Sequence, residues 1–249
     1  MARGIVRGAG GFFFVTFLLT TILLLGLTQF TQYGNLKPII TDIIYQQVRG
    51  QMNETQLSEL KFYFTLYCQT INETIKFNFT FVELEVNCSE ILDKQPEQII
   101  KIFASKTFDT IYYKEYEYGF IDCLKNITKE EEYSVVISKK SNTFFEEILR
   151  YSLLSTVFFL LIFLLASKNW YSRTRDLGIS LIFIGVPYFV FEFFIYDLLQ
   201  KFLPIKAIEI ATPVITAILD ILSPKFFLIL IGGIILLLVA FILRAKSRK

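Results

Sequence analysis

The residue pattern with the clearest chemical meaning in this chain is a run of Asn-X-Ser/Thr triplets. The stretch INETIKFNFTFVELEVNCSE, residues 71–90, contains three of them. The asparagine amide of such a triplet accepts an N-linked glycan in proteins that are exported to a surface or a secretory compartment. Five triplets occur in all, headed by Asn53, Asn72, Asn78, Asn87 and Asn126. The pattern therefore predicts a glycosylated segment that faces away from the cytoplasm.

The cysteines predict disulfide chemistry in the same segment. Cys68, Cys88 and Cys123 are the three cysteines of the chain, and in an oxidising compartment they predict one disulfide with one thiol left over. Cys68 and Cys88 each continue an apolar face, which favours that pair and a contribution of about 3 kcal/mol. The alternatives are that Cys123 replaces one of them or links two chains. We expect no metal site, because there is no histidine and no C-x-x-C spacing.

Two acidic residues interrupt an apolar stretch, Glu192 and Asp197 in YFVFEFFIYDLL. An ionisable group at membrane depth is costly and indicates function by default. One interpretation is an ion or proton pathway. The structural alternative is that Glu192 reaches the interface or pairs with Lys201 or Lys206.

Catalytic patterns are missing from the sequence. Without histidine there is no triad and no imidazole proton shuttle, and G-x-S-x-G, P-loop and G-x-G-x-x-G motifs do not occur. We therefore expect a protein that is not an enzyme and that holds no cofactor. The basic tail RAKSRK is interpreted as a determinant of membrane topology that touches anionic lipid, not as a nucleic-acid contact.

The elements that position these residues are set by hydropathy. The chain is 53% hydrophobic and 19% charged, against about 45–50% and 25% in soluble domains. Crossing a bilayer takes about 20 apolar residues. Four stretches approach that length: GFFFVTFLLTTILLLGLTQF, which ends at Phe30, and residues 148–167, 177–199 and 226–243. The first is predicted to be an uncleaved anchor, because it is longer than a signal-peptide core and no small-x-small site follows it.

Charge patterning predicts the orientation. Lys and Arg concentrate in short flanks on the cytoplasmic side. With four spans, three basic flanks share one side: Arg3 and Arg7; Lys168, Arg173 and Arg175; Arg244, Lys246, Arg248 and Lys249. Residues 31–149, with 12 Lys/Arg against 18 Asp/Glu, then face outward. All five glycosylation triplets fall in this segment, which the charge rule assigns independently.

Local patterns predict a small, mainly helical α+β domain over 31–149. Pro38 predicts a helix start, NETQ at 53–56 resembles a capping box, and another helix follows Pro96. Leu57, Leu60, Phe64, Tyr67 and Cys68 form the predicted buried stripe of the second helix. From Ile75 apolar residues alternate as in a strand, and their phase flips at Phe81–Val82, which predicts a bulge. YSVVIS, residues 133–138, is predicted to be a partner strand.

The segment FLPIKAIEIATPVITAILDILSP, residues 202–224, is predicted to contain an interfacial helix near 205–222. The alternatives are a platform beneath the outer domain or a re-entrant piece that lines a cavity. Thr212–Pro213 and Ser223–Pro224 each resemble a helix start.

Together these patterns predict an α-helical multi-pass membrane protein. Its parts are a cytoplasmic N-terminus with the first anchor (1–30), an extracellular glycosylated domain (31–149) and a three-helix membrane domain (150–249). The predicted function is that of a non-catalytic surface glycoprotein in the cell membrane, whose outer domain binds a partner or assembles into a larger membrane complex. The predicted partners are the lipid bilayer and either another protein or further copies of the chain. The alternative is an oligomeric channel, a transporter or a transporter subunit that uses Glu192 and Asp197.

Overall fold

Four helices of this chain are long and apolar enough to cross a membrane. The computed structural model describes residues 2–70, 74–79, 82–116, 119–125, 134–167, 169–202 and 204–246. The candidate spans are Gly4–Thr31, Lys139–Ala166, Trp170–Lys201 and Ala211–Lys246. They belong to α1 (Ala2–Thr31), α7 (Lys139–Ala166), α8 (Trp170–Phe202) and α9 (Ile205–Lys246). The prediction of a mostly helical protein with four candidate spans is confirmed.

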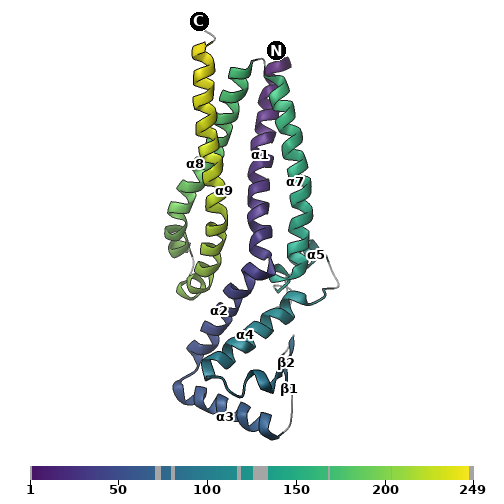
Figure 1. The fold of residues 1–249 in the computed structure, drawn as a ribbon, viewed down its shortest axis with the longest axis vertical. Helices are drawn as coiled ribbons and strands as arrows, with labels where there is room; N and C mark the ends of the chain where they lie inside the picture. Colours follow the sequence, from purple (N-terminus) through teal and green to yellow (C-terminus); the bar gives the residue numbers. More distant parts are fainter. Residues whose placement is uncertain are drawn as a thin grey trace. The chain divides into compact units, whose positions relative to one another are not determined.

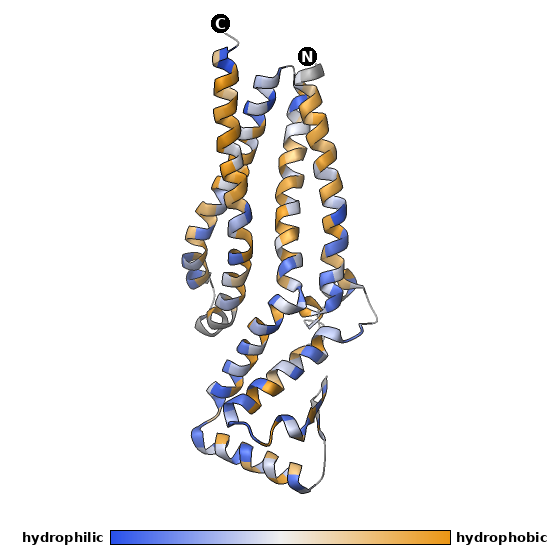
Figure 2. Ribbon diagram, in the orientation of Figure 1, coloured by the Kyte–Doolittle hydropathy of each residue, from blue (hydrophilic) through white to orange (hydrophobic). Residues whose placement is uncertain are grey.

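The chain divides into two compact units. One comprises Met1–Phe30 with Phe145–Lys249 and the other Thr31–Phe144. Hydrophobic residues dominate the four long helices, whereas α2, α3 and α4 of the second unit mix polar and hydrophobic residues (Figure 2). Within the first unit, the first turn of α1 and the last turn of α9 lie at the same end of the long helices (Figure 1).

Helix α9 corrects the predicted end of the chain. The interfacial helix expected near 205–222 is not separate, because α9 runs unbroken for 42 residues with Pro213 and Pro224 inside it. At 1.5 Å per residue α9 is about 63 Å long, about twice the hydrocarbon thickness. Nearby side chains bond to carbonyls next to those that the prolines leave free: Thr212 donates to Ile208, Tyr188 to Leu219 and Lys225 to Ile221.

Helices α8 and α9 form an antiparallel pair that glycine brings close together. A Cβ at Gly178 would lie 2.8 Å from the Gly233 carbonyl oxygen, and one at Gly233 would lie 2.9 Å from that of Gly178. Further along the pair, the Tyr188 and Phe226 rings stack with centroids 4.0 Å apart. Small residues that let backbones approach are the usual interface of membrane helices.

Helix α1 packs on α7 through aromatic rings and hydroxyl groups. Phe13 and Phe17 of α1 both stack on Phe159 of α7, with centroids 5.1 and 5.2 Å apart. One turn further along, the Thr21 hydroxyl lies 2.8 Å from that of Ser152 and 2.8 Å from that of Thr156. These buried hydroxyls satisfy one another, as polar groups between membrane helices must.

The second unit begins with α2 (Tyr33–Gln51), which follows α1 after Gln32 alone. Helices α1 and α2 are therefore contiguous, so the predicted domain is not inserted between the first two helices of the chain. In the sequence, the second unit lies between α1 and α7, the first two candidate spans. The predicted helix start at Pro38 is wrong, because Pro38 lies inside α2. An extra turn precedes it because Leu36 is completely buried and the Tyr33 hydroxyl donates to Asp109, 2.7 Å away.

Helix α3 (Glu54–Thr70) leads into a β-hairpin of β1 (Thr74–Phe79) and β2 (Val82–Asn87), followed by a 3₁₀ turn, η1 (Cys88–Glu90). The strands are antiparallel, with Ile75 opposite Val86 and Phe79 opposite Val82. The predicted bulge is wrong. Residues that face each other across two strands lie on the same side of the hairpin. In this register the odd-numbered apolar residues of β1 face the even-numbered apolar residues of β2, so the apolar alternation changes from odd to even positions between the strands.

Helix α4 (Pro96–Tyr113) provides more of the buried hydrophobic residues than any other described element of this unit, among them Ile99, Ala104 and Phe108. It starts at Pro96 as predicted. Short helices α5 (Phe120–Lys125) and η2 (Ser134–Ile137) follow. The predicted strand 133–138 is wrong: its described part, from Ser134, is η2, and Val135 is completely buried.

Candidate functional site

Helix α3 starts as its sequence predicts. The backbone N–H of Gln56 donates to Asn53 Oδ1 at 2.8 Å, and the backbone N–H of Asn53 donates to Gln56 Oε1 at 2.9 Å. This reciprocal pair confirms the predicted capping box, which satisfies two amides that have no partner inside the helix. Leu57, in the next turn, is 1% exposed and fixes which side of α3 faces the core.

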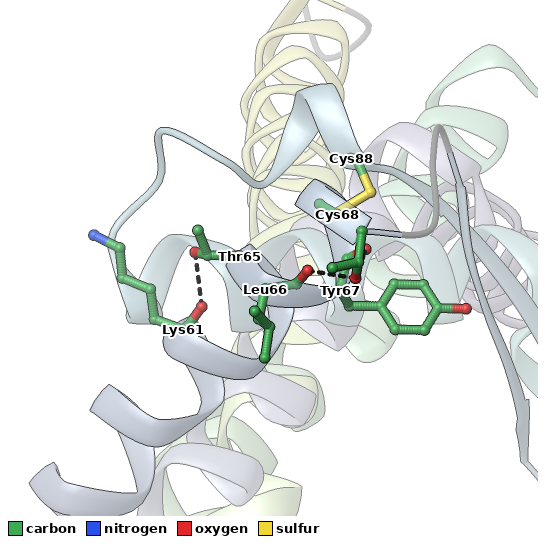
Figure 3. Close-up of a disulfide and its surroundings, with 7 residues drawn as sticks. Lys61, Thr65, Leu66, Tyr67, Cys68 and Cys88 are labelled. Atoms are coloured by element: carbon green, nitrogen blue, oxygen red, sulfur yellow. Dashed lines mark hydrogen bonds between the residues drawn. A yellow bond between two sulfur atoms is a disulfide. The ribbon is translucent and has the colours of Figure 1, made fainter.

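The inner face of α3 is held by an aromatic stack and a disulfide. Phe64 stacks on Phe103 of α4 with ring centroids 5.1 Å apart. Cys68 and Cys88 form a disulfide with a Cα–Cα distance of 5.4 Å (Figure 3), which is the pair that the sequence favours. Cys88 packs in a cluster with Ile75 and Val86, so the disulfide joins α3 to the end of the hairpin.

The outer face of α3 carries four large apolar side chains that no described residue of this unit covers. Phe62, Tyr63, Leu66 and Tyr67 are 64%, 66%, 47% and 38% exposed. Positions i, i+1, i+4 and i+5 share one side of a helix, so these residues form a single patch, which we name the α3 aromatic face. In Figure 3, Leu66 and Tyr67 lie on the turn of α3 that leads to Cys68.

This patch corrects one sequence prediction. Tyr67 was expected in the buried stripe, but it belongs to the exposed side. The signal was present in the sequence: apolar residues occupy 60, 62, 63, 64, 66, 67 and 68, more than one core-facing stripe about 100° wide holds. A helix with too many apolar positions for one stripe has a second apolar face.

The glycosylation asparagines are only partly within the described residues. Asn53 and Asn87 are both exposed, and the Asn87 amide donates to Glu90 Oε1 at 3.3 Å. Asn72 and Asn126 lie outside the described residues, as does the side chain of Asn78 in β1. Glycan attachment at all five remains a prediction.

Cys123 lies in α5, but its side chain is outside the described residues. Its role therefore stays a prediction. Over the described part of the chain no group of three or more His, Cys, Asp or Glu residues is placed to hold a metal ion.

A second polar feature of this unit lies between α2 and α4. Lys37 Nζ donates to the Tyr33 hydroxyl at 2.6 Å and to Asp109 Oδ2 at 2.9 Å. Partial burial lowers the pKa of Lys37, but hydrogen bonds to Tyr33 and Asp109 raise it by more, so the net shift is upward. A lysine held protonated in this way is a poor base or nucleophile at neutral pH, so the cluster is a structural clamp.

The two acidic residues of α8 do not form a shared site. They are five residues apart, which places them about 140° apart around a helix of 3.6 residues per turn. Glu192 is half-buried and Asp197 is exposed. Among the described ion pairs neither acid is paired with Lys201, and the side chain of Lys206 lies outside the described residues.

Sequence reasoning missed a charge cluster where α1 meets α8. Asp176 accepts from Arg7, from Arg175 Nη2 at 2.9 Å and from Ser172 Oγ at 3.3 Å. In the sequence analysis Arg7 and Arg175 served only to predict which side of the membrane each flank faces. The signal in the sequence was Asp176, the one acidic residue of this basic flank. A single carboxylate beside several basic side chains at the end of a span is expected to form ion pairs with them.

The fold defines a class: a mostly helical protein with four apolar helices that suggest embedding in a membrane. Comparison of the chain with protein-family models, with curated proteins and with solved structures finds no match.

Proposed function

We propose that this chain is a non-catalytic glycoprotein of the cell membrane that binds a protein partner through the α3 aromatic face. In this proposal both termini are cytoplasmic, and residues 31–149 form an extracellular, mainly helical α+β domain. The partner is another protein or a second copy of the chain.

One observation carries the binding role, the exposure of four large apolar residues on one side of α3. Exposed apolar patches are rare on soluble surfaces and mark interaction sites. Tyrosine and phenylalanine are enriched at protein interfaces, where single aromatic anchors provide much of the binding energy. The opposite side of α3 is held by the disulfide and the Phe64–Phe103 stack, so the face is presented on a rigid support, which lowers the entropy cost of binding.

The outward placement of this unit rests on charge and glycosylation patterns. The three basic flanks predict that both termini are cytoplasmic. The start of α1 and the end of α9 lie at the same end of the first unit, which agrees with an even number of spans. The disulfide in the second unit favours an oxidising compartment.

The binding role is tested by the double variant Phe62→Ser/Tyr63→Ser in the full chain, captured from native membranes in mild detergent after chemical cross-linking. Gln69→Ala, an exposed polar position on the same helix, is the matched control. We expect recovery of the specific partner to fall about tenfold in the double variant and to stay near wild type in the control. Equal recovery of the partner with wild type, the double variant and the control would exclude the α3 aromatic face as the binding site.

The variant Glu192→Gln distinguishes the alternative function, transport through Glu192 and Asp197, from partner binding. This variant removes the charge and keeps the shape of the side chain. A partner-binding role predicts unchanged capture of the partner, whereas an ion pathway predicts altered flux or pH dependence in proteoliposomes.

A further inference from the structure

A groove with one charged end lies in the first unit, bordered by α1 and α8. Its volume is about 380 Å³. The apolar part is lined by Phe12 and Val15 of α1 and by Ile179 and Phe183 of α8, with Phe163 of α7 also in contact. Both bordering helices are candidate membrane spans. We name it the α1–α8 groove.

Glycine keeps this groove open. Gly8 and Gly11 both line it. A Cβ at Gly11 would meet the Phe163 ring at 3.0 Å, whereas a Cβ at Gly8 would meet no atom within 4 Å. Gly11 is therefore required for packing, while Gly8 leaves space that no protein atom fills.

The charged end carries an excess of positive charge. Arg7 and Arg175 both donate to Asp176, and one carboxylate balances only one of two guanidinium groups. Each guanidinium has five N–H donors, of which Asp176 takes a minority. Arg7 and Asp176 line the groove, and Asp176 also holds Arg175 beside it. Both cations keep N–H donors beyond those that Asp176 takes, an arrangement suited to a phosphate group.

Aromatic and basic residues continue this end along α8. Arg173 lies over the Trp170 ring at 5.0 Å, and Arg175 lies over the Tyr171 ring at 5.5 Å. Tryptophan and tyrosine beside arginine are typical of the interface between hydrocarbon and headgroups. The polar end of the groove therefore lies at headgroup depth, and its apolar part extends into the hydrocarbon.

The depth of the groove and its charge favour a lipid. From Arg7 to Val15 the helix rises about 12 Å at 1.5 Å per residue, within the about 15 Å depth of one leaflet. The walls are apolar over this depth, and basic groups lie at one end. A phospholipid has the same order, an apolar hydrocarbon chain followed by a phosphate group.

We propose that the α1–α8 groove binds an anionic phospholipid of the bilayer, with one hydrocarbon chain along Gly8 and its phosphate at Arg7 and Arg175. With the predicted orientation, this lipid belongs to the cytoplasmic leaflet. The site is independent of the α3 aromatic face, which lies in the other unit.

The test is native mass spectrometry of the full chain in detergent, titrated with dioleoyl phosphatidylglycerol and, separately, with dioleoyl phosphatidylcholine. We expect one saturable phosphatidylglycerol site, about fivefold tighter than for phosphatidylcholine, as expected for one unbalanced basic side chain near the headgroup. Gly8→Phe fills the groove and lowers phosphatidylglycerol affinity about tenfold, because the ring takes the space of the hydrocarbon chain. Gly4→Phe, at another open position of the same helix, leaves affinity within about twofold of wild type.

Arg7→Gln separates headgroup recognition from the chain contact. Asp176 keeps Arg175 as its partner, so the helix contact is not left with an unpaired carboxylate. We expect the preference for phosphatidylglycerol to disappear while phosphatidylcholine binding is unchanged.

The proposal is overturned if wild type shows no saturable phosphatidylglycerol site, if Gly8→Phe binds as well as Gly4→Phe, or if Arg7→Gln retains the preference. A further check addresses a protein occupant. In native membranes treated with the oxidant copper phenanthroline, Gly8→Cys in a Cys123→Ala background should give no more disulfide-linked dimer than Gly4→Cys in the same background. An excess of dimer at position 8 would assign the groove to a second copy of the chain.

Discussion

Gly233 shows how one hydrogen atom in place of a side chain sets the geometry of two helices. A Cβ there would lie 2.9 Å from the Gly178 carbonyl oxygen and 3.0 Å from the Ile182 amide nitrogen. Both are backbone atoms, so no side-chain rotation relieves the contact, and α8 and α9 must separate. The neighbouring Gly232 is different, because a Cβ there meets only the end of Leu181 at 3.9 Å.

We therefore predict opposite outcomes for two adjacent substitutions. Gly233→Ala should lower the free energy of unfolding by about 1–3 kcal/mol, the usual cost of an added methyl group in a tight contact. Gly232→Ala should be neutral or stabilising by up to about 1 kcal/mol, because alanine favours helix. Unfolding in mixed micelles, followed by circular dichroism, measures both. Equal effects at the two positions would contradict the close approach at Gly233.

Lys37 provides a pH-dependent prediction at the same scale. Its folded-state pKa is raised above the ordinary value of 10.5 despite partial burial, because Tyr33 and Asp109 bond to the ammonium group. A group with a raised folded pKa stabilises the fold fully below its unfolded pKa, and this contribution is lost as pH rises through the folded pKa. We expect the melting temperature of wild type to fall more steeply above about pH 10.5 than that of Lys37→Met.

The control for this alkaline loss is Lys94→Met, which removes an exposed lysine of the same unit. Its melting curve should keep the slope of wild type. If Lys37→Met and wild type lose stability in parallel across the alkaline range, the Lys37–Asp109 bond contributes nothing measurable. Because these side chains are about one-third exposed, the whole effect should not exceed about 1 kcal/mol.

At the scale of elements, the sequence predicted helices better than it predicted turns and ends. The capping box at Asn53 and the start at Pro96 are local signals, and the structure has both. The apolar residues do change from odd to even positions near Phe81. A bulge within one strand and a hairpin of two strands both produce this change in the sequence. Only the cross-strand partners, such as Ile75 and Val86, distinguish the two.

Proline was over-interpreted for a related reason. Pro38, Pro213 and Pro224 each resemble helix starts in the sequence, and each lies inside a helix. Proline costs a helix about 3 kcal/mol when nothing compensates, and at Pro38 the contacts that hold the preceding turn come from another element. The Tyr33–Asp109 bond is between residues 76 positions apart, and no local window of sequence contains it. The sequence of α3 indicates two apolar faces, but an apolar pattern does not say which of the two is covered.

The disulfide gives the element-scale prediction. Replacing both Cys68 and Cys88 by serine releases α3 from the hairpin and should lower the free energy of unfolding of this unit by about 3 kcal/mol. Reduction of the wild-type chain should have a similar effect. Chemical denaturation of the full chain, monitored by aromatic fluorescence with and without reductant, measures it. If the double variant equals oxidised wild type, the disulfide does not stabilise the native unit.

At the scale of the whole molecule, the proposal depends on the side of the membrane that each unit faces. Basic residues in the short flanks predict cytoplasmic termini, and an even number of spans places residues 31–149 on the opposite side. In a Cys123→Ala background, where Cys68 and Cys88 are oxidised, new thiols report this directly. A membrane-impermeant maleimide should label Ser58→Cys on α3 in intact cells, and should label Lys246→Cys at the end of α9 only after permeabilisation. Both positions are exposed, so burial does not explain a lack of labelling. The reverse pattern would place the α3 aromatic face in the cytoplasm, where N-glycosylation does not occur, and would require a cytoplasmic partner.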